Sequence, residues 1–561
     1  MRTLFLITAL ALCSSTARVA AQTSFVTNDS ITVNNIHAGI SVHGELWSDP
    51  GANGYITRHC EFPANSGKHI NFIGSMWMSG YDAGNQLHIA AQTYRQNGSD
   101  YWPGPLDGSG AVAYATSYKW AKIWKVNTNE IQAFRMMMVH TIYNTPQSIL
   151  TWPGKGNAYA RGNAGYTLTI TSEMAPFADL NGNGLYEPLS GEYPDIKGDA
   201  AAWWVFSDNG AAHAETNGLP MGVEVHATVY GYKRNSDIDN VLYYDFDIYN
   251  KSPNTYTNSR VAIWDDVELG AYMDDYIGFD SVHRMGITYN ADPTDGAYAG
   301  VPEEAYGVNI PITGLSIVAA PGDAGTTLVP AGSFNAYQND NTVIGNPYLP
   351  DEYNNYMRAR IRTGAHITNR FGGAGMPCTP LGTGPDCNYL FPGDPSNAAQ
   401  WSECQCDSLR GDRRFVLSSN DFTLPAGGSA HIVYALMARE YAGACGTINF
   451  NGIKRLADTA WSIYHNPPPP LPVAIDAVSQ AGAIRIYPNP AQSELYIADD
   501  LSNNSETATI AVYNALGQTM LVDHVKTGNN YRIDIARFAK GLYHIRYTNG
   551  TVQYATTILK D

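Results

Sequence analysis

The sequence predicts a mainly β protein with two parts: a large β-sandwich-like body with long loop insertions and a few helices, and a small C-terminal immunoglobulin-like β-sandwich. Near the C-terminus, segments of alternating apolar and polar residues recur roughly every eight to twelve positions, as in a small sandwich. The chain has 53 Gly and 37 Tyr, and only 15% of its residues are charged. This composition is typical of loop-rich, β-rich extracellular proteins.

The C-terminal strands show the clearest alternation. Leu495 and Ile497 share one face of their segment, and Ile510 and Val512 share one face of the next. A period of two with one apolar face indicates half-buried strands. About eighty residues is enough for such a module to fold alone.

The body is predicted to contain strands that lie far apart in the sequence, together with two helices. One helix is expected at 127–140, because Asn127 can cap it and Glu130 stands three residues later. An amphipathic helix is expected at 448–464. The largest insertion spans 292–405. Strands are expected at residues 223–232, 241–249, 260–264, 413–417, 422–424 and 430–437.

The domain boundaries follow from composition. Residues 1–21 resemble a signal peptide: Arg2 precedes an apolar run too short to span a bilayer, and small residues end at Ala21. A lipoprotein signal at Cys13 is the weaker alternative, because Leu12 stands where a small residue is expected. The remaining boundaries are expected as a β-rich body at 22–465, divisible near residue 175 into 22–175 and 176–465, a Pro-rich linker at 466–483, and the C-terminal module at 484–561.

The net charge of −17 argues against nucleic-acid binding. It suits a soluble surface and divalent cations, although a solvated acidic surface explains it equally well. After the signal peptide no run is long and apolar enough to predict a transmembrane helix.

The segment from Asp179 to Glu187 has the spacing of a calcium loop. It places oxygen-bearing side chains at positions 1, 3, 5 and 9 and Gly184 at position 6, and calcium prefers six to eight oxygen ligands on a sharply turned loop. The loop resembles those of EF-hands, dockerins and thrombospondin repeats, but Ser190 replaces the usual Glu at position 12, where Glu192 or Asp195 would have to substitute. The alternative is a hydrogen-bonded turn without metal. The predicted calcium ligands are Asp179, Asn181, Asn183, the Leu185 carbonyl and Glu187.

A second acidic cluster follows the predicted strand that ends at Trp264. Three interpretations stay open: a solvated acidic loop, a second cation site, or the two carboxylates of a glycoside hydrolase. The cluster consists of Asp265, Asp266, Glu268, Asp274, Asp275 and Asp280.

Four cysteines crowd into a stretch rich in Gly and Pro: Cys378, Cys387, Cys404 and Cys406. In an exported chain such a group favours disulfides, which stabilise a loop of this kind most. Zinc is the alternative, but the usual Cys-x₂₋₄-Cys spacing is missing.

Common enzyme signatures are absent from the sequence. We find no His-Glu-x-x-His, no Gly-x-Ser-x-Gly and no Walker A loop, so the catalytic residues stay unknown. His213 and His226 follow a Trp-rich segment, but isolated histidines usually satisfy structural hydrogen bonds. A glycosidase needs no local signature, so a secreted hydrolase remains the second hypothesis.

The C-terminal module also carries a family resemblance. Its motifs Tyr487-Pro-Asn-Pro490, Tyr513-Asn-x-x-Gly-Gln518, Ile533-Asp-Ile535 and Lys540-Gly-Leu-Tyr543 resemble, in order, the type A C-terminal sorting domain of the type IX secretion system. The resemblance implies export through the periplasm across the outer membrane of a Gram-negative bacterium, with the secretion machinery as partner. The expected sorting-motif residues are Tyr487, Pro488, Asn489, Pro490, Lys540, Gly541, Leu542 and Tyr543.

The body resembles segments of large, uncharacterised cargo proteins that carry the same sorting domain. The resemblance rests on Gln92-Thr-Tyr-Arg95, Trp102-Pro-Gly-Pro105, Trp203-Trp-Val-Phe206 and Asp412-Arg-Arg-Phe415, and it implies no catalytic residue. The leading hypothesis is therefore a secreted or cell-surface protein whose calcium-stabilised body serves adhesion, structure or the binding of an extracellular ligand such as surface polysaccharide.

Overall fold

The structure is a computed structural model that divides into two compact units, Met1–Leu471 and Pro472–Asp561. It describes residues 28–50, 56–94, 98–296, 304–325, 327–369, 384–406, 411–441, 443, 445–470, 484–499, 507–514, 518–526, 531–549 and 552–561. The predicted signal peptide and most of the predicted linker lie outside these residues.

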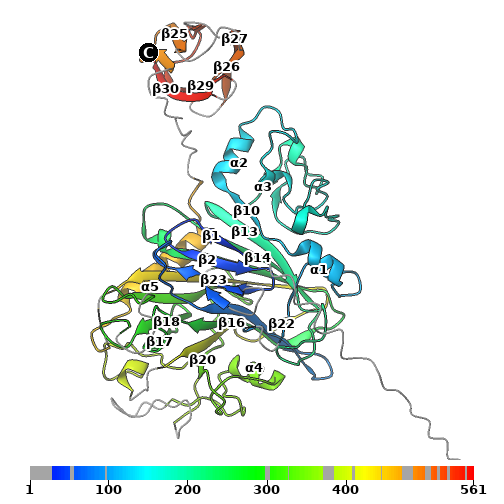
Figure 1. Ribbon diagram of the computed structural model, residues 1–561, viewed down its shortest axis with the longest axis vertical. Helices are drawn as coiled ribbons and strands as arrows, with labels where there is room; N and C mark the ends of the chain where they lie inside the picture. The colour runs from blue at the N-terminus through cyan, green and yellow to red at the C-terminus, as the bar shows by residue number, and fades with distance from the viewer. Residues whose placement is uncertain are drawn as a thin grey trace, which may run out of the picture. The chain divides into compact units, whose positions relative to one another are not determined.

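The body is built on two antiparallel sheets (Figure 1). The first has the strand order β1-β2-β3-β7-β16-β21-β20, with β6, β8 and β22 pairing β2, β7 and β16. Its strands are β1 (Asn28–Thr32), β2 (His37–Ser41), β3 (Glu45–Leu46), β6 (Cys60–Glu61), β7 (Ile73–Tyr81), β8 (Leu87–Ala90), β16 (Tyr256–Val267), β20 (Ser333–Gln338), β21 (Arg413–Ser418) and β22 (Phe422–Leu424).

The second sheet has the order β10-β13-β14-β15-β23-β19-β18-β17, with β9 beside β13. Two short hairpins, β4–β5 and β11–β12, stand outside both sheets. The strands of this sheet are β9 (Trp102–Pro103), β10 (Trp124–Asn127), β13 (Ala200–Ser207), β14 (Val223–Gly231), β15 (Val241–Asn250), β17 (Asp275–Asp280), β18 (Met285–Asn290), β19 (Pro311–Ala319) and β23 (Ser429–Glu440), and those of the hairpins are β4 (Ser48–Pro50), β5 (Ile56–Arg58), β11 (Phe177–Ala178) and β12 (Tyr193–Pro194).

The two sheets share one apolar core. Along β15, Leu242, Tyr244, Phe246 and Ile248 are buried in it, and Ile263 contributes from β16 of the opposite sheet. Because side chains alternate along a strand, the residues between them point away from this core. The strands predicted at 223–232, 241–249, 413–417, 422–424 and 430–437 all form, and the one expected at 260–264 is the middle of the longer β16.

Two separate structures cover the outer face of the second sheet. Helix α5 (Asn451–His465) packs Ile453 and Leu456 against Val433 and Met437 of β23. The chain between β10 and β13 packs a different apolar cluster, which includes Phe134 and Trp152, against the other end of the sheet. In Figure 1 this second covering carries the helices α2 (Thr128–Arg135) and α3 (Gln147–Leu150), next to α1 (Tyr114–Trp120). The outer face of the first sheet is covered by α4 (Pro350–Tyr356).

The first predicted helix begins as expected but is shorter. The Asn127 side chain accepts from the Glu130 amide at 2.9 Å, and the Asn127 amide donates to the Glu130 carboxylate at 3.3 Å, which is the predicted capping box. The helix ends at Arg135 rather than at 140. Ile131 and Phe134 are buried, whereas Met138 is 78% exposed, so another turn would have no apolar surface to cover.

The body is one unit and does not divide near residue 175. Strand β7 pairs with β16 over eight registered positions, from Thr257–Tyr81 to Asp266–Ile73. These strands come from opposite sides of the expected boundary, so the two parts share a sheet and a core.

The C-terminal module is a small sandwich, as predicted. One sheet has the order β24-β25-β28 and the other β27-β26-β29-β30. The alternating residues named from the sequence, Leu495, Ile497, Ile510 and Val512, are all buried between them. The strands are β24 (Ile484–Tyr487), β25 (Glu494–Asp499), β26 (Thr507–Asn514), β27 (Thr519–Lys526), β28 (Tyr531–Asp534), β29 (Gly541–Asn549) and β30 (Val552–Lys560).

The cysteines are only partly paired as predicted. Cys404 bonds Cys445, a residue outside the predicted group, and Cys406 is also disulfide-bonded. Cys387 is a free thiol, so the prediction for this residue is wrong, and Cys378 lies outside the described residues. The fold brings residue 445, between β23 and α5, close to residue 404. Because this contact depends on the fold, the spacing of cysteines in the sequence could not predict the pairing.

We expect a peptide map of the unreduced, denatured protein to contain a linked Cys404–Cys445 peptide and an alkylated Cys387. In the native protein, Cys387 should react slowly near neutral pH, because burial raises the pKa of its thiol to about 11 and the thiolate is the reactive form. Mass spectrometry after brief alkylation tests both points. A Cys387 linked to another cysteine would contradict this pairing.

Candidate functional site

A cavity of about 530 Å³ opens on the outer face of the second sheet. Its floor is formed by the outward residues of β13, β14 and β15, and its wall by the chain that precedes β13. It therefore lies beside the covering built around Phe134 and Trp152. The lining residues include Trp152, Glu173, Phe177, Asp179, Gly184, Asp195, Lys197, Trp203, His226, Thr228, Asp245, Asp247 and Tyr249.

The floor is polar because of the alternation within β15. The residues that leave the sandwich core on this strand are Tyr243, Asp245, Asp247 and Tyr249. Asp247 stands directly opposite His226 of β14 on one side and His431 of β23 on the other. A row of imidazole, carboxylate and imidazole thus crosses three neighbouring strands.

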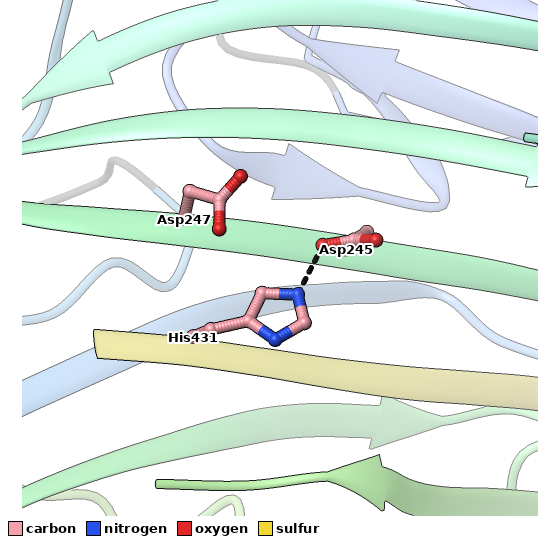
Figure 2. A group of neighbouring side chains, drawn as sticks. All are labelled: Asp245, Asp247 and His431. Atoms are coloured by element: carbon pink, nitrogen blue, oxygen red, sulfur yellow. Dashed lines mark hydrogen bonds and ion pairs between the residues drawn. The ribbon is translucent and has the colours of Figure 1, made fainter. Parts of the chain in front are cut away.

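Asp245 anchors the polar network of the floor. One of its oxygens lies 2.7 Å from His431 Nε2, and the other accepts from Lys197 Nζ at 2.7 Å. Figure 2 shows the two carboxylates on one strand and the imidazole on the neighbouring strand. Asp247 makes no hydrogen bond or ion pair with any residue that the structure describes, so its carboxylate is available to a ligand.

The charges of this network shift one another's ionisation. Burial opposes the charged form of Asp245, but the His431 hydrogen bond and the Lys197 ammonium outweigh it and lower the pKa of Asp245. Burial also opposes charge on His431, yet Asp245 and Asp247 outweigh it and raise the pKa of the imidazole. Partial loss of hydration raises the pKa of Asp247, and the like charge of Asp245 adds to this shift.

The predicted calcium loop lies at the wall of the same cavity, where Asp179 and Gly184 line it. The Asp179 carboxylate accepts from the amides of Gly182 at 2.8 Å, Asn183 at 3.2 Å and Gly184 at 2.7 Å. These hydrogen bonds, with that of Gly184 the strongest, lower the pKa of Asp179. Gly182 and Gly184 both have φ near +70°, at 73° and 74°, which glycine adopts without strain.

The other predicted ligands of the loop converge on Glu187. Asn181 Nδ2 and Asn183 Nδ2 donate to one oxygen of Glu187 at 2.8 and 2.7 Å. Glu192, considered as a substitute for the missing Glu at position 12, is buried instead and accepts from the amides of Leu180 at 3.1 Å and Glu187 at 2.7 Å. Asn181, Asn183 and Glu187 are therefore joined through their side chains, whereas backbone amides bind the Asp179 carboxylate. Glu192 holds the two ends of the loop together.

The second acidic cluster does not form one open site. All six carboxylates are buried, and they are divided among several local networks. Asp265 accepts from Asn71 Nδ2 at 2.7 Å, and burial raises its pKa well above the usual range. The Asp275 carboxylate accepts from the Leu269 amide at 2.9 Å, and burial likewise raises its pKa. These two groups stabilise the chain around them.

Two further members of the cluster are paired with arginines, the buried Arg414 and the half-buried Arg58. Asp266 lies 3.0 Å from Arg414 Nη2, and Tyr94 donates to the same carboxylate oxygen at 2.6 Å. Glu268 lies 2.5 Å from Arg58 Nη2. Together with Asp412 they form a group of three carboxylates, but the two guanidinium groups already supply its positive charge.

The last two members lie apart from these pairs. Asp280 bonds His283 at 2.9 Å and faces Lys454 at 3.4 Å; burial opposes the charge, but these cations outweigh it and lower the pKa of Asp280 to about 2. Burial raises the pKa of Asp274 to about 6, with the charge of Asp295 as the next cause. The six carboxylates therefore do not gather into one site, although Asp266 and Glu268 lie close together in one group with Asp412.

His213 is structural, as expected of an isolated histidine. Its side chain is fully buried, with Nδ1 2.8 Å from the Ile89 carbonyl and Nε2 2.6 Å from the Asp208 carbonyl. Both ring nitrogens therefore contact backbone carbonyls, and the carboxylates of Asp100 and Asp208 lie 3.4 and 3.9 Å from the ring.

Sequence reasoning missed Asp245, Asp247 and His431. A signal was present for two of them, because two acids spaced two apart within a predicted strand lie on the same face of a sheet. His431 had no such signal, since its contact depends on the pairing of β15 with a strand nearly two hundred residues later in the chain.

The predicted sorting motif joins the two ends of the C-terminal module. Asn489 Nδ2 donates to the Thr557 carbonyl at 3.0 Å, and Asn489 Oδ1 accepts from the Leu559 amide at 2.9 Å. Tyr543 donates to the Ala539 carbonyl at 2.9 Å. Asn489 therefore holds the first loop of the module against its last strand, β30.

Comparison with protein families assigns the C-terminal module to a known family of sorting domains. Residues 485–561 match the family described as secretion system C-terminal sorting domain. The chain carries a type IX secretion sorting domain. No curated protein matches the chain.

Three solved structures resemble parts of the chain. A DUF3244 protein with an immunoglobulin-like β-sandwich fold from Bacteroides vulgatus has 16% identity and a TM-score of 0.13, over 14% of this chain and 84% of that one. A polysaccharide lyase has 10% identity and a TM-score of 0.18, over 60% of this chain and 34% of that one. Dimeric latent PorU from Porphyromonas gingivalis has 10% identity and a TM-score of 0.12, over 64% of this chain and 31% of that one. This chain spans about a third of the last two, and at these TM-scores none informs the function of the body.

The sorting domain determines the destination of the protein. It marks the chain as cargo of the type IX secretion machinery, released or attached at the outer-membrane surface. Among the residues that the structure describes, the helices are all too short or too polar to cross a membrane.

Proposed function

We propose that the body of this exported protein is a calcium-stabilised binding module whose cavity takes a neutral or amino-bearing saccharide. The observation that carries the proposal is that the calcium loop and the binding cavity share Asp179 and Gly184. Ordering the loop would therefore order one wall of the cavity.

The loop chemistry supports calcium. Asp179, Asn181, Asn183 and Glu187 lie on one tight turn, on which both Asn side chains contact Glu187, and oxygen ligands of this kind suit calcium. Rotation of each Asn amide by half a turn would direct its oxygen, in place of its nitrogen, toward Glu187. A calcium ion would then replace the two Asn–Glu187 hydrogen bonds.

The cavity chemistry supports a polar ligand with hydroxyl or amino groups. Carboxylates outnumber the cationic groups along its lining, with Lys197 as the lysine among them. This charge disfavours polyanions. Tyr249 lines the cavity and is half-buried, with its ring 4.7 Å from that of His226 and 5.2 Å from Lys251 Nζ. The carboxylates and His226 can bond hydroxyl groups.

We expect Asp179→Ala to abolish a calcium-dependent rise in melting temperature. Binding to the folded state alone stabilises a protein by about 2.7 kcal/mol at a hundredfold excess over Kd, and a large domain then gains a few degrees. Calorimetry with calcium and with a chelator measures the difference. Asp237→Ala, at another exposed acid, is the matched control and should retain the full calcium effect.

The binding test uses a panel of neutral, amino-bearing and acidic oligosaccharides on the full chain. Binding of a neutral or amino-bearing member should weaken at least about tenfold with Tyr249→Ala and, when calcium is chelated, by a similar factor. If Tyr249→Ala binds every oligosaccharide of the panel as the wild type does, the ligand does not bind in this cavity. Identical melting of the wild type with calcium and with chelator would contradict the calcium loop.

A further inference from the structure

Asp245 and Asp247 on the floor of the cavity, with His431 on the neighbouring strand β23, have the chemistry of a transition-metal site. One ligand atom from each of Asp245, Asp247 and His431 lies within 4.8 Å of the other two. Two carboxylates and an imidazole are the donor types that bind zinc and related divalent ions. The group is distinct from every residue of the calcium loop.

The backbone holds these three donors in fixed positions. Asp245 and Asp247 are two apart on the same face of β15, and His431 is registered directly opposite Asp247 on β23. Both strands lie inside the sheet, with β14 and β19 as their outer neighbours. Such preorganisation lowers the cost of gathering the ligands around an ion.

The surrounding contacts leave the donors free to bind. His431 Nε2 and Asp245 share a hydrogen bond of 2.7 Å, whose proton an ion would replace. Lys197 contacts the other oxygen of Asp245, so it can remain there and orient the carboxylate. The Lys197 side chain is 54% exposed and can also move away.

The cavity provides access for an ion. Asp245 and Asp247 line it, and Asp247 is exposed. Neighbouring ligand atoms around zinc lie roughly 3–3.5 Å apart for bonds of about 2.0–2.1 Å, so only small side-chain movements are required. Three protein ligands would leave a position open toward the cavity.

We propose that Asp245, Asp247 and His431 bind a divalent transition-metal ion of the zinc type at the floor of the cavity. The imidazole ligand distinguishes this site from the oxygen-only calcium loop, because zinc accepts nitrogen readily and calcium prefers oxygen. The proposal goes beyond the saccharide-binding function and does not depend on it.

Isothermal titration of the chelator-treated full chain with Zn²⁺ tests the site. We expect Asp247→Asn and His431→Gln each to remove one zinc equivalent or to weaken it at least about tenfold. Asp179→Ala should leave this equivalent unchanged, which separates it from the calcium loop. Because Asp247 is exposed, Asp247→Asn is expected to fold. If His431→Gln does not fold, Asp247→Asn alone tests the zinc site.

His283→Gln is the matched control. His283 is also paired with carboxylates, Asp280 at 2.9 Å and Asp458 at 3.1 Å, but it belongs to no group of three close donors among the described residues. The proposal is overturned if this control loses the same zinc equivalent, if Asp247→Asn binds zinc like the wild type, or if the wild type binds none with a Kd below about 100 μM. Visible absorption of the Co²⁺ form should show the same dependence on Asp247.

Discussion

Removal of residues 484–561 is expected to abolish delivery of the protein to the cell surface and medium. The sorting domain is a folded module with its own core, separate from that of the body, so its loss leaves the body intact but without its export signal. Immunoblots of periplasmic, surface and medium fractions measure the effect. The truncated chain should accumulate in the periplasm.

A point variant tests whether export requires the folded sorting domain, without shortening the chain. Ile545 is 1% exposed in the core of the sorting domain, and Ile545→Asp would place an unpaired charge there. It should reproduce the deletion, whereas Thr519→Asp on β27 of the same domain, where the side chain is exposed, should be exported normally. Surface delivery of the truncated chain at the wild-type level would show that the module is not required.

Arg414→Ala is expected to destabilise the body by about 3–5 kcal/mol, because it leaves the buried carboxylate of Asp266 without its partner. Arg414 is 3% exposed, donates to Tyr94 OH at 2.5 Å and also contacts Asp412 at 2.6 Å. Removing the guanidinium therefore breaks several contacts of one network. Denaturant unfolding of the variant and the wild type measures the free energy of unfolding.

Two control variants test the cause of this loss. Arg439→Ala removes an exposed pair with Asp237, 3.5 Å apart, and should cost less than about 1 kcal/mol. Adding Asp266→Asn to Arg414→Ala should recover part of the stability, since the unpaired charge disappears. Equal losses for Arg414→Ala and Arg439→Ala would show that the buried pair contributes no more than a surface pair.

Much of the fold could be predicted because it depends on local patterns. Strand β15 forms where Leu242, Tyr244, Phe246 and Ile248 alternate with outward residues, and α2 begins at the capping box of Asn127. The end of α2 could not be predicted, because it depends on how much apolar surface the neighbouring strands leave uncovered.

The candidate sites divide in the same way. The tight turn that we propose as a calcium loop could be predicted from the spacing of Asp179, Asn181, Asn183 and Glu187, since a loop of nine residues brings its own side chains together. The arrangement of the acidic cluster at residues 265–280 could not be predicted, for the opposite reason. Its carboxylates alternate between the two faces of β16 and continue into a different sheet, so only Asp266 and Glu268 meet, in a group with the distant Asp412.

The sequence by itself determined the β-rich class, the sorting domain with its motifs, and the tight turn at residues 179–187. In each case the interacting residues lie within one strand, one loop or one small module. Only the tertiary structure decided the Cys404–Cys445 pairing, the buried Arg414–Asp266 pair and the meeting of Asp245 and Asp247 with His431. The physical reason is that these contacts depend on strand pairing and packing between distant segments, which the order of residues within each segment does not specify.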